Sequence, residues 1–141
     1  MRYERFLNIA AEYAKTSPHE FRHGSIIVKA GRIVGSGINT QRYTSNLPKK
    51  IDDSIWEDLN TSERRDYLGR IANPNVHAEV DAILCTKANL KGATMYVARI
   101  NAKGQMAMSR PCAMCRQFMQ KHGIDSCVYS ISNNEWGILK I

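Results

Sequence analysis

The chain has 141 residues, 43% of them hydrophobic, and carries a formal net charge of +7. Its length fits one domain with one core, its hydrophobic content excludes wholesale disorder, and it has no apolar run of the roughly 20 residues that cross a bilayer. The positive charge indicates partners that carry phosphate but does not identify one.

The hydrophobic pattern of the first half of the chain predicts two helices and a pair of strands. In chain order we expect a helix over 2–15, strands over 25–29 and 32–38, a loop over 40–50 and a helix over 53–71. Pro18 ends the first helix, and Ala30-Gly31 turns the two strands into a hairpin. Asp53 or Ser54 caps the second helix, which is rich in charge.

The second half predicts two further helices and three strands. In chain order these are a helix over 77–87, a strand over 93–100, a helix over 111–122 and strands over 126–131 and 136–141. Pro111 opens the last helix and Gly123 follows its end, which is the usual asymmetry of helix termini. The connection between the last two strands is too short for a crossover helix, so these strands must pair antiparallel. The order of elements predicts an α/β fold with mixed strand directions.

Whether the cysteines are expected to form disulfides or a metal site depends on the cellular compartment of the protein. The N-terminal segment lacks the apolar stretch of a signal peptide, so we expect a cytoplasmic protein with reduced cysteines and no membrane partner. Of the four cysteines, Cys112 and Cys115 form a close pair, which in such a protein is typical of a metal or redox site. Cys85 and Cys127 lie in apolar surroundings and are expected to be core residues.

Two fragments that each open a predicted helix are His77-Ala78-Glu79 and Pro111-Cys112-Ala113-Met114-Cys115. Cys112 and Cys115 share one helix face, so both thiolates can reach one ion, and the positive helix N-terminus favours the thiolate form. His77 adds a nitrogen ligand. Three protein ligands leave a tetrahedral zinc one open position, which is the pattern of a catalytic site.

Glu79 lies near these ligands without being needed as one. A carboxylate there can take a proton from water and pass it to a ring nitrogen or a leaving amine. The Cys pair alone would also fit a structural zinc or a redox pair. A four-ligand structural site would need another Cys or His, and none of the remaining histidines, His19, His23 and His122, has a ligand-like spacing to the pair. The joint pattern H-x-E…P-C-x-x-C is the signature of zinc-dependent nucleobase deaminases.

The chain resembles the cytidine/deoxycytidylate deaminase superfamily over nearly its whole length. The matching segments are Gly37-Ile38-Asn39, His77 to Ile83, Gly92 to Val97, Pro111 to Gln117 and Gly123 to Tyr129. The resemblance implies a single domain over 1–141 with a three-layer α/β/α cytidine-deaminase-like fold and a five-stranded mixed sheet. It implies one catalytic zinc per subunit on His77, Cys112 and Cys115, with Glu79 as proton shuttle, and a homo-oligomer in which a neighbour completes each pocket.

The same resemblance implies a set of substrate contacts. The backbone N–H of Ala78 would contact the base, the carbonyl near Arg110 would accept a hydrogen bond from the leaving ammonia, and Asn39 would hold the sugar or a base edge. Gln41 stands where the free-cytidine branch has a ribose-binding glutamate. Arg42 follows in the same loop and offers a fork for a phosphate, although an exposed loop charge explains it equally well.

We therefore expect a zinc-dependent hydrolase that converts a cytosine nucleotide or nucleoside to the uracil product and ammonia. One alternative is a nucleic-acid deaminase acting on cytosine in single-stranded DNA or adenosine in tRNA, with the basic segment 22–50 as a backbone track. The chain lacks the dense cluster of basic and aromatic residues typical of such enzymes. A second alternative is a non-catalytic binding protein that keeps the fold and the zinc, against which the intact Glu79 argues.

Overall fold

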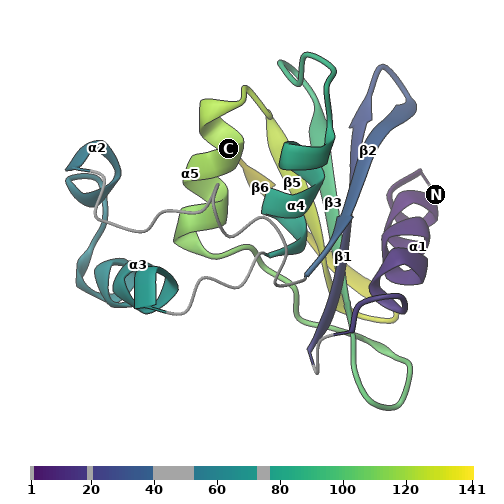
Figure 1. Ribbon diagram of the computed structural model, residues 1–141. Helices are drawn as coiled ribbons and strands as arrows, with labels where there is room; N and C mark the ends of the chain where they lie inside the picture. Colours follow the sequence, from purple (N-terminus) through teal and green to yellow (C-terminus); the bar gives the residue numbers. More distant parts are fainter. Residues whose placement is uncertain (1, 19–20, 40–52, 73–76) are drawn as a thin grey trace.

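The computed structural model describes residues 2–18, 21–39, 53–72 and 77–141. The helices are α1 (Arg2–Ala14), α2 (Asp53–Trp56), α3 (Thr61–Ala72), α4 (Ala78–Cys85) and α5 (Ala113–Lys121). The strands are β1 (Arg22–Lys29), β2 (Arg32–Ile38), β3 (Thr94–Ile100), β4 (Met106–Ala107), β5 (Ser126–Ser132) and β6 (Glu135–Lys140). The sheet is the middle layer, with α1 on one face and α4 and α5 on the other (Figure 1). This is the predicted three-layer α/β/α fold.

The sheet runs in the order β2-β1-β3-β5-β6, and β4 pairs with β3. β3 and β5 are parallel, whereas the other neighbouring strands are antiparallel. The antiparallel pairing of β5 with β6, predicted from their short connection, is confirmed. The prediction of five strands missed β4, because two residues are too few to produce a periodic pattern.

Alternate residues of β1 and β3 point to opposite faces of the sheet and build two separate cores. Ile26 and Tyr96 pack with the apolar side of α1 on one face. Ile27 and Val97 pack with α4 and α5 on the other. The predicted amphipathic helix at the N-terminus is therefore confirmed, since its apolar side covers the sheet.

β1 begins at Arg22, before the predicted start at residue 25. The early part of this strand carries Gly24, a residue that is depleted in strands and hides the pattern. Packing explains the glycine: a Cβ there would lie 2.3 Å from the carbonyl oxygen of Ala10 in α1. The close contact of α1 with β1 thus requires Gly24, the same residue that hid the start of the strand in the sequence.

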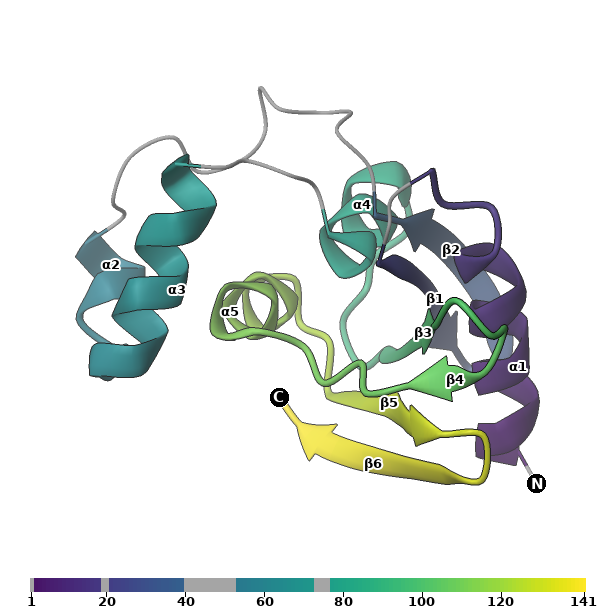
Figure 2. The ribbon, with the colours of Figure 1, turned by 90° about the horizontal axis from the view of Figure 1, so that it is seen from below.

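The predicted helix over 53–71 is wrong as a single element, because the chain forms α2 and then α3 with a break between them. Asn60 caps α3: its Oδ1 accepts a hydrogen bond from the Glu63 N–H at 2.9 Å, and its own N–H donates to the Glu63 carboxylate at 3.2 Å. This is a capping box, which starts a new helix. Both helices lie outside α5, away from the central strands (Figure 2).

Among the residues that the structure describes, no helix combines the length and the apolar character needed to cross a lipid bilayer.

A substitution in β2 tests the close approach of this strand to α4. A Cβ on Gly37 would lie 2.3 Å from the backbone nitrogen of Ala82 and 2.5 Å from the Ala78 carbonyl oxygen. We expect Gly37→Ala to lower the free energy of unfolding by about 2–3 kcal/mol, because backbone must move to accept the methyl group. Urea denaturation followed by circular dichroism measures this. Ser36→Ala, which adds no atom to the same strand, is the control, and an equal loss in both variants would contradict the close approach.

Candidate metal centre

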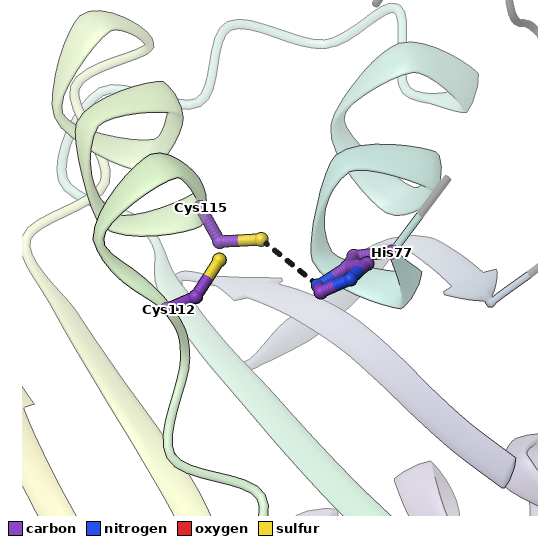
Figure 3. A group of neighbouring side chains, drawn as sticks. All are labelled: His77, Cys112 and Cys115. Atoms are coloured by element: carbon purple, nitrogen blue, oxygen red, sulfur yellow. Dashed lines mark hydrogen bonds between the residues drawn. The ribbon is translucent and has the colours of Figure 1, made fainter. Parts of the chain in front are cut away.

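The three predicted ligands come from the starts of two helices. His77 is the N-cap of α4, Cys112 is the N-cap of α5, and Cys115 lies in the first turn of α5. Neither N-cap side chain caps its own helix. The ligand atoms of all three residues lie within 4.8 Å of one another, and their side chains point toward a common centre (Figure 3). The structure therefore brings together the residues that the sequence paired by motif.

The geometry of this group fits a tetrahedral ion. Cys115 Sγ lies 3.6 Å from His77 Nδ1. With Zn–S near 2.3 Å and Zn–N near 2.05 Å, a tetrahedral zinc would hold these two atoms about 3.6 Å apart. Two sulfurs and one imidazole nitrogen are also a donor set that zinc prefers. Within the described part of the chain this is the one group of three His, Cys, Asp or Glu residues able to hold a metal.

Buried polar contacts fix the start of α4 over the sheet. The hydroxyl of Ser25 in β1 donates to the Ala78 carbonyl at 2.6 Å. The carboxylate of Asp81, 2% exposed, accepts a hydrogen bond from the Ile38 N–H at 2.9 Å. The first of these bonds ties α4 to β1 and the second ties it to the end of β2. Together they set the position of His77, which directly precedes the helix.

A second set of contacts fixes the segment that leads into α5. Ser109 is buried, and its hydroxyl donates to the Val97 carbonyl of β3 at 2.9 Å. Its backbone N–H donates to the Ser130 carbonyl of β5 at 2.9 Å. On the outer side of α5, Arg116 forms an ion pair with Glu63 of α3 at 2.5 Å. The two cysteines are thus held from the sheet on one side and from α3 on the other.

Glu79 lies in the first turn of α4 and is 3% exposed. Its carboxylate has no hydrogen bond or ion pair with the described residues. Burial raises the pKa of the Cys127 thiol well above its ordinary value, and the negative charge of Glu79 raises it further. Cys127 therefore stays protonated, and it is fully buried in the core, as predicted. The same prediction is wrong for Cys85, which is the last residue of α4 and is exposed.

His23 belongs to the same region, although no site role was predicted for it. Burial lowers the pKa of His23, the charge of Glu79 opposes this, and His77 and Arg99 lower it further. The imidazole is therefore neutral at pH 7 and lies within electrostatic reach of Glu79 and His77. Its position follows from strand alternation, since Ser25, the next residue on the same face of β1, contacts α4. Because the predicted strand began only at residue 25, this alternation could not be extended to His23 from the sequence.

Asn39, a predicted substrate contact, follows β2 and is buried. Its side-chain oxygen accepts hydrogen bonds from the His23 N–H at 2.8 Å and the Ser17 hydroxyl at 2.6 Å. Its amide nitrogen donates to the Phe21 carbonyl. The side chain therefore joins the end of β2 to the start of β1, beside His23, and its contact with a substrate stays a prediction.

The remaining predicted contacts differ in their surroundings. Ala78 is buried and is the first residue of α4, so its N–H has no acceptor within the helix. Arg110 is exposed, with its guanidinium carbon 5.9 Å from the centroid of the Tyr129 ring. The substrate roles of both stay predictions. Gln41 and Arg42 lie outside the described residues.

Comparison with known proteins agrees with the fold and the motif. The family model of the cytidine and deoxycytidylate deaminase zinc-binding region matches residues 1–131. No curated protein sequence matches the chain. The apo structure of dCMP deaminase from the cyanophage S-TIM5 is similar with a TM-score of 0.58 and 19% identity, covering 92% of this chain and 82% of that one. The cytidine deaminase of Burkholderia pseudomallei is similar with a TM-score of 0.54 and 15% identity, covering 99% and 93%.

The reactivity of the cysteines tests the metal centre directly. In zinc-loaded native protein we expect a thiol reagent to modify the exposed Cys85 quickly, and the buried Cys127 to react only in denaturant. Ligation protects the partly exposed Cys112, so a chelator should release one additional reactive thiol in the native protein, whereas the buried Cys115 should react only in denaturant, as Cys127 does. Thiol titration with mass mapping of the modified peptides measures this, and Cys85→Ser removes the background. Equal reactivity of Cys112 with and without the chelator would contradict metal binding.

Proposed function

Since the chain belongs to the cytidine and deoxycytidylate deaminase family, we propose that it is a zinc-dependent hydrolase that converts a cytosine nucleotide or nucleoside to the uracil product and ammonia. The observation that carries the proposal is the convergence of His77, Cys112 and Cys115 beside the buried Glu79. Family membership implies a hydrolytic enzyme. The cytosine base, the zinc and the roles of individual residues are the proposed part.

In this proposal His77, Cys112 and Cys115 hold the ion. Zinc, when bound there, supplies a Lewis acid that makes water nucleophilic near neutral pH. The protein holds the ion with three ligands and leaves one position for water or substrate. The two helix N-termini stabilise the thiolates, since the dipole of each helix is positive at that end.

Glu79 moves the protons of the reaction. Its carboxylate accepts a proton from the attacking water as the oxygen bonds to C4 of the cytosine ring, and gives that proton to the ring nitrogen N3. It then transfers the second proton of the water oxygen to the amino group, and the C4–N bond breaks to release ammonia. A buried carboxylate to which no described residue hydrogen-bonds is suited to both steps, because its oxygens are available to the substrate and to water.

The proposed substrate contacts surround this centre. The Ala78 N–H, without an acceptor in α4, donates to the base. The Asn39 side chain holds the sugar or a base edge, and the carbonyl near Arg110 accepts a hydrogen bond from ammonia as it leaves. Gln41 and Arg42 extend this surface. The S-TIM5 dCMP deaminase, whose structure with dCMP and dUMP is similar with a TM-score of 0.56, supports a nucleotide substrate.

We also propose a single domain over residues 1–141, a homo-oligomer and a cytoplasmic location, as the family resemblance implies. Light scattering of the purified chain measures the subunit number, and a monomeric mass would contradict the second of these.

Ammonia release from separate substrates tests the proposed reaction. We expect zinc-loaded protein to deaminate at least one of cytidine, deoxycytidine, CMP, dCMP and dCTP, and to leave adenosine, dAMP and guanine unchanged. Single-stranded DNA and a tRNA anticodon stem are run in parallel. Turnover of a polymer with none of any monomer would overturn the proposal in favour of a nucleic-acid deaminase.

A substitution at Glu79 tests the proton shuttle. We expect Glu79→Gln to lower kcat by about 10²- to 10⁴-fold, because the amide cannot accept and return a proton. Zinc content, measured by mass spectrometry, should stay the same since the residue is not a ligand. Glu12→Gln makes the same change on an exposed residue of α1, on the opposite face of the sheet, and should keep full activity. Retained activity in Glu79→Gln would remove this residue from the mechanism.

A further inference from the structure

We propose that Arg99 binds the phosphate of the substrate, so that the enzyme acts on cytosine mononucleotides in preference to nucleosides. This inference rests on the proposed deaminase function and narrows its substrate class. Arg99 is not among the site residues predicted from the sequence.

The position of Arg99 follows from strand alternation. Met95 and Val97 of β3 pack with α4 and α5, so Arg99, the next residue of the same alternation, lies on that face too. It stands near the end of β3, directly opposite His23 of β1 in the register of the two strands. Arg99 therefore lies on the face of the sheet that carries the metal centre.

Arg99, Glu79 and His77 all influence the pKa of His23, so all three lie near that residue. Burial is the main cause of the lowered pKa of His23, and the charges of Glu79, His77 and Arg99 all act on it as well. Glu79, His77 and Arg99 are therefore all close enough to His23 to interact with it electrostatically. Because His23 is neutral at pH 7, Arg99 carries positive charge there without a second cation from His23.

Arg99 has no acidic partner among the described residues, where the ion pairs are Lys15–Glu12 and Arg116–Glu63. Its Nε is buried and has no hydrogen-bond acceptor. A half-buried guanidinium without a counter-charge is costly, since burial removes water that would solvate it. An anionic group from a ligand would supply both the missing charge and the missing acceptor.

The guanidinium is also oriented for such a ligand. Its carbon lies 5.4 Å from the centroid of the Phe21 ring, which is 52% exposed. Phe21 is itself held in place, because its carbonyl accepts a hydrogen bond from the Asn39 side chain. A cation–π contact of this kind holds the guanidinium beside the ring and does not use its N–H groups. Those N–H groups match the oxygens of a phosphate, which is the fork geometry that arginine provides.

The test compares kcat/KM for dCMP and deoxycytidine in the zinc-loaded full chain. We expect the wild type to prefer dCMP. In Arg99→Gln the value for dCMP should fall by about 10- to 100-fold, the usual range for a hydrogen bond to a charged group, with deoxycytidine within about twofold of the wild type. Arg99→Lys keeps the charge without the fork and should be intermediate. Arg32→Gln, on an exposed arginine at the start of β2, should change neither substrate.

Several results would overturn the inference while leaving the deaminase function in place. These are an equal loss on both substrates in Arg99→Gln, no loss on either, a wild-type preference for deoxycytidine, or a deficit confined to single-stranded DNA. Thermal unfolding and zinc content show whether Arg99→Gln is folded, and Arg99→Lys decides the matter if it is not.

If the wild type deaminates no cytosine compound, the proposed function fails, and equilibrium binding still tests Arg99. Calorimetry would then compare dUMP with deoxyuridine. Binding of dUMP that weakens by about 10-fold or more in Arg99→Gln would keep the phosphate site without the reaction. Absence of dUMP binding, or equal binding by both proteins, would overturn the site as well.

Discussion

The meeting of two helix N-termini over one face of the sheet is the constraint on which the metal centre depends. α4 and α5 carry the ligands at their first residues, so a small shift of either helix along its axis would separate His77 from the cysteines. Rigid buried contacts prevent this shift. Ser25 and Asp81 tie α4 to β1 and β2, and Ser109 ties the entry to α5 to β3 and β5. The proposed chemistry follows from this rigidity, since a tetrahedral ion needs its ligands in place.

The antiparallel pairing of β1 with β3 determines which titratable and charged side chains lie close together at one end of the sheet. It brings the start of one strand beside the end of the other, and so places His23 opposite Arg99. The two side chains lie on the face that carries Glu79 and His77. The buried Glu79, the neutral His23 imidazole and an arginine without an acidic partner among the described residues are thereby gathered near the candidate metal centre. In the proposed deamination of a nucleotide, Glu79 would carry the protons and Arg99 would bind the anion.

The parts of the fold that depend on residues close together in the sequence could be predicted. The helix that follows His77, the hairpin at Ala30-Gly31 and the antiparallel last strands all rest on neighbouring residues, and the structure confirms them. The last helix is confirmed too, but it begins at Ala113 and not at the predicted Pro111, because Cys112 is its N-cap. The roles of His23 and Arg99 could not be predicted in this way, because they arise from the register between strands far apart in the chain. The break before α3 is a different case. Asn60 and Glu63 form a readable capping box, but the charged pattern around it continues across the break.

The separation of the ligands along the chain has a consequence for folding. The chain between His77 and Cys112 contains α4, β3 and β4. An ion bound by both residues would therefore close a long loop of the polypeptide, and this constraint would remove conformational freedom from the unfolded chain. The three ligands come together only in the folded state, so by mass action an ion bound there would favour that state. If zinc is that ion, as proposed, the fraction of chains that are folded would depend partly on the free zinc concentration, and a cell short of zinc would hold less of the protein in its native form.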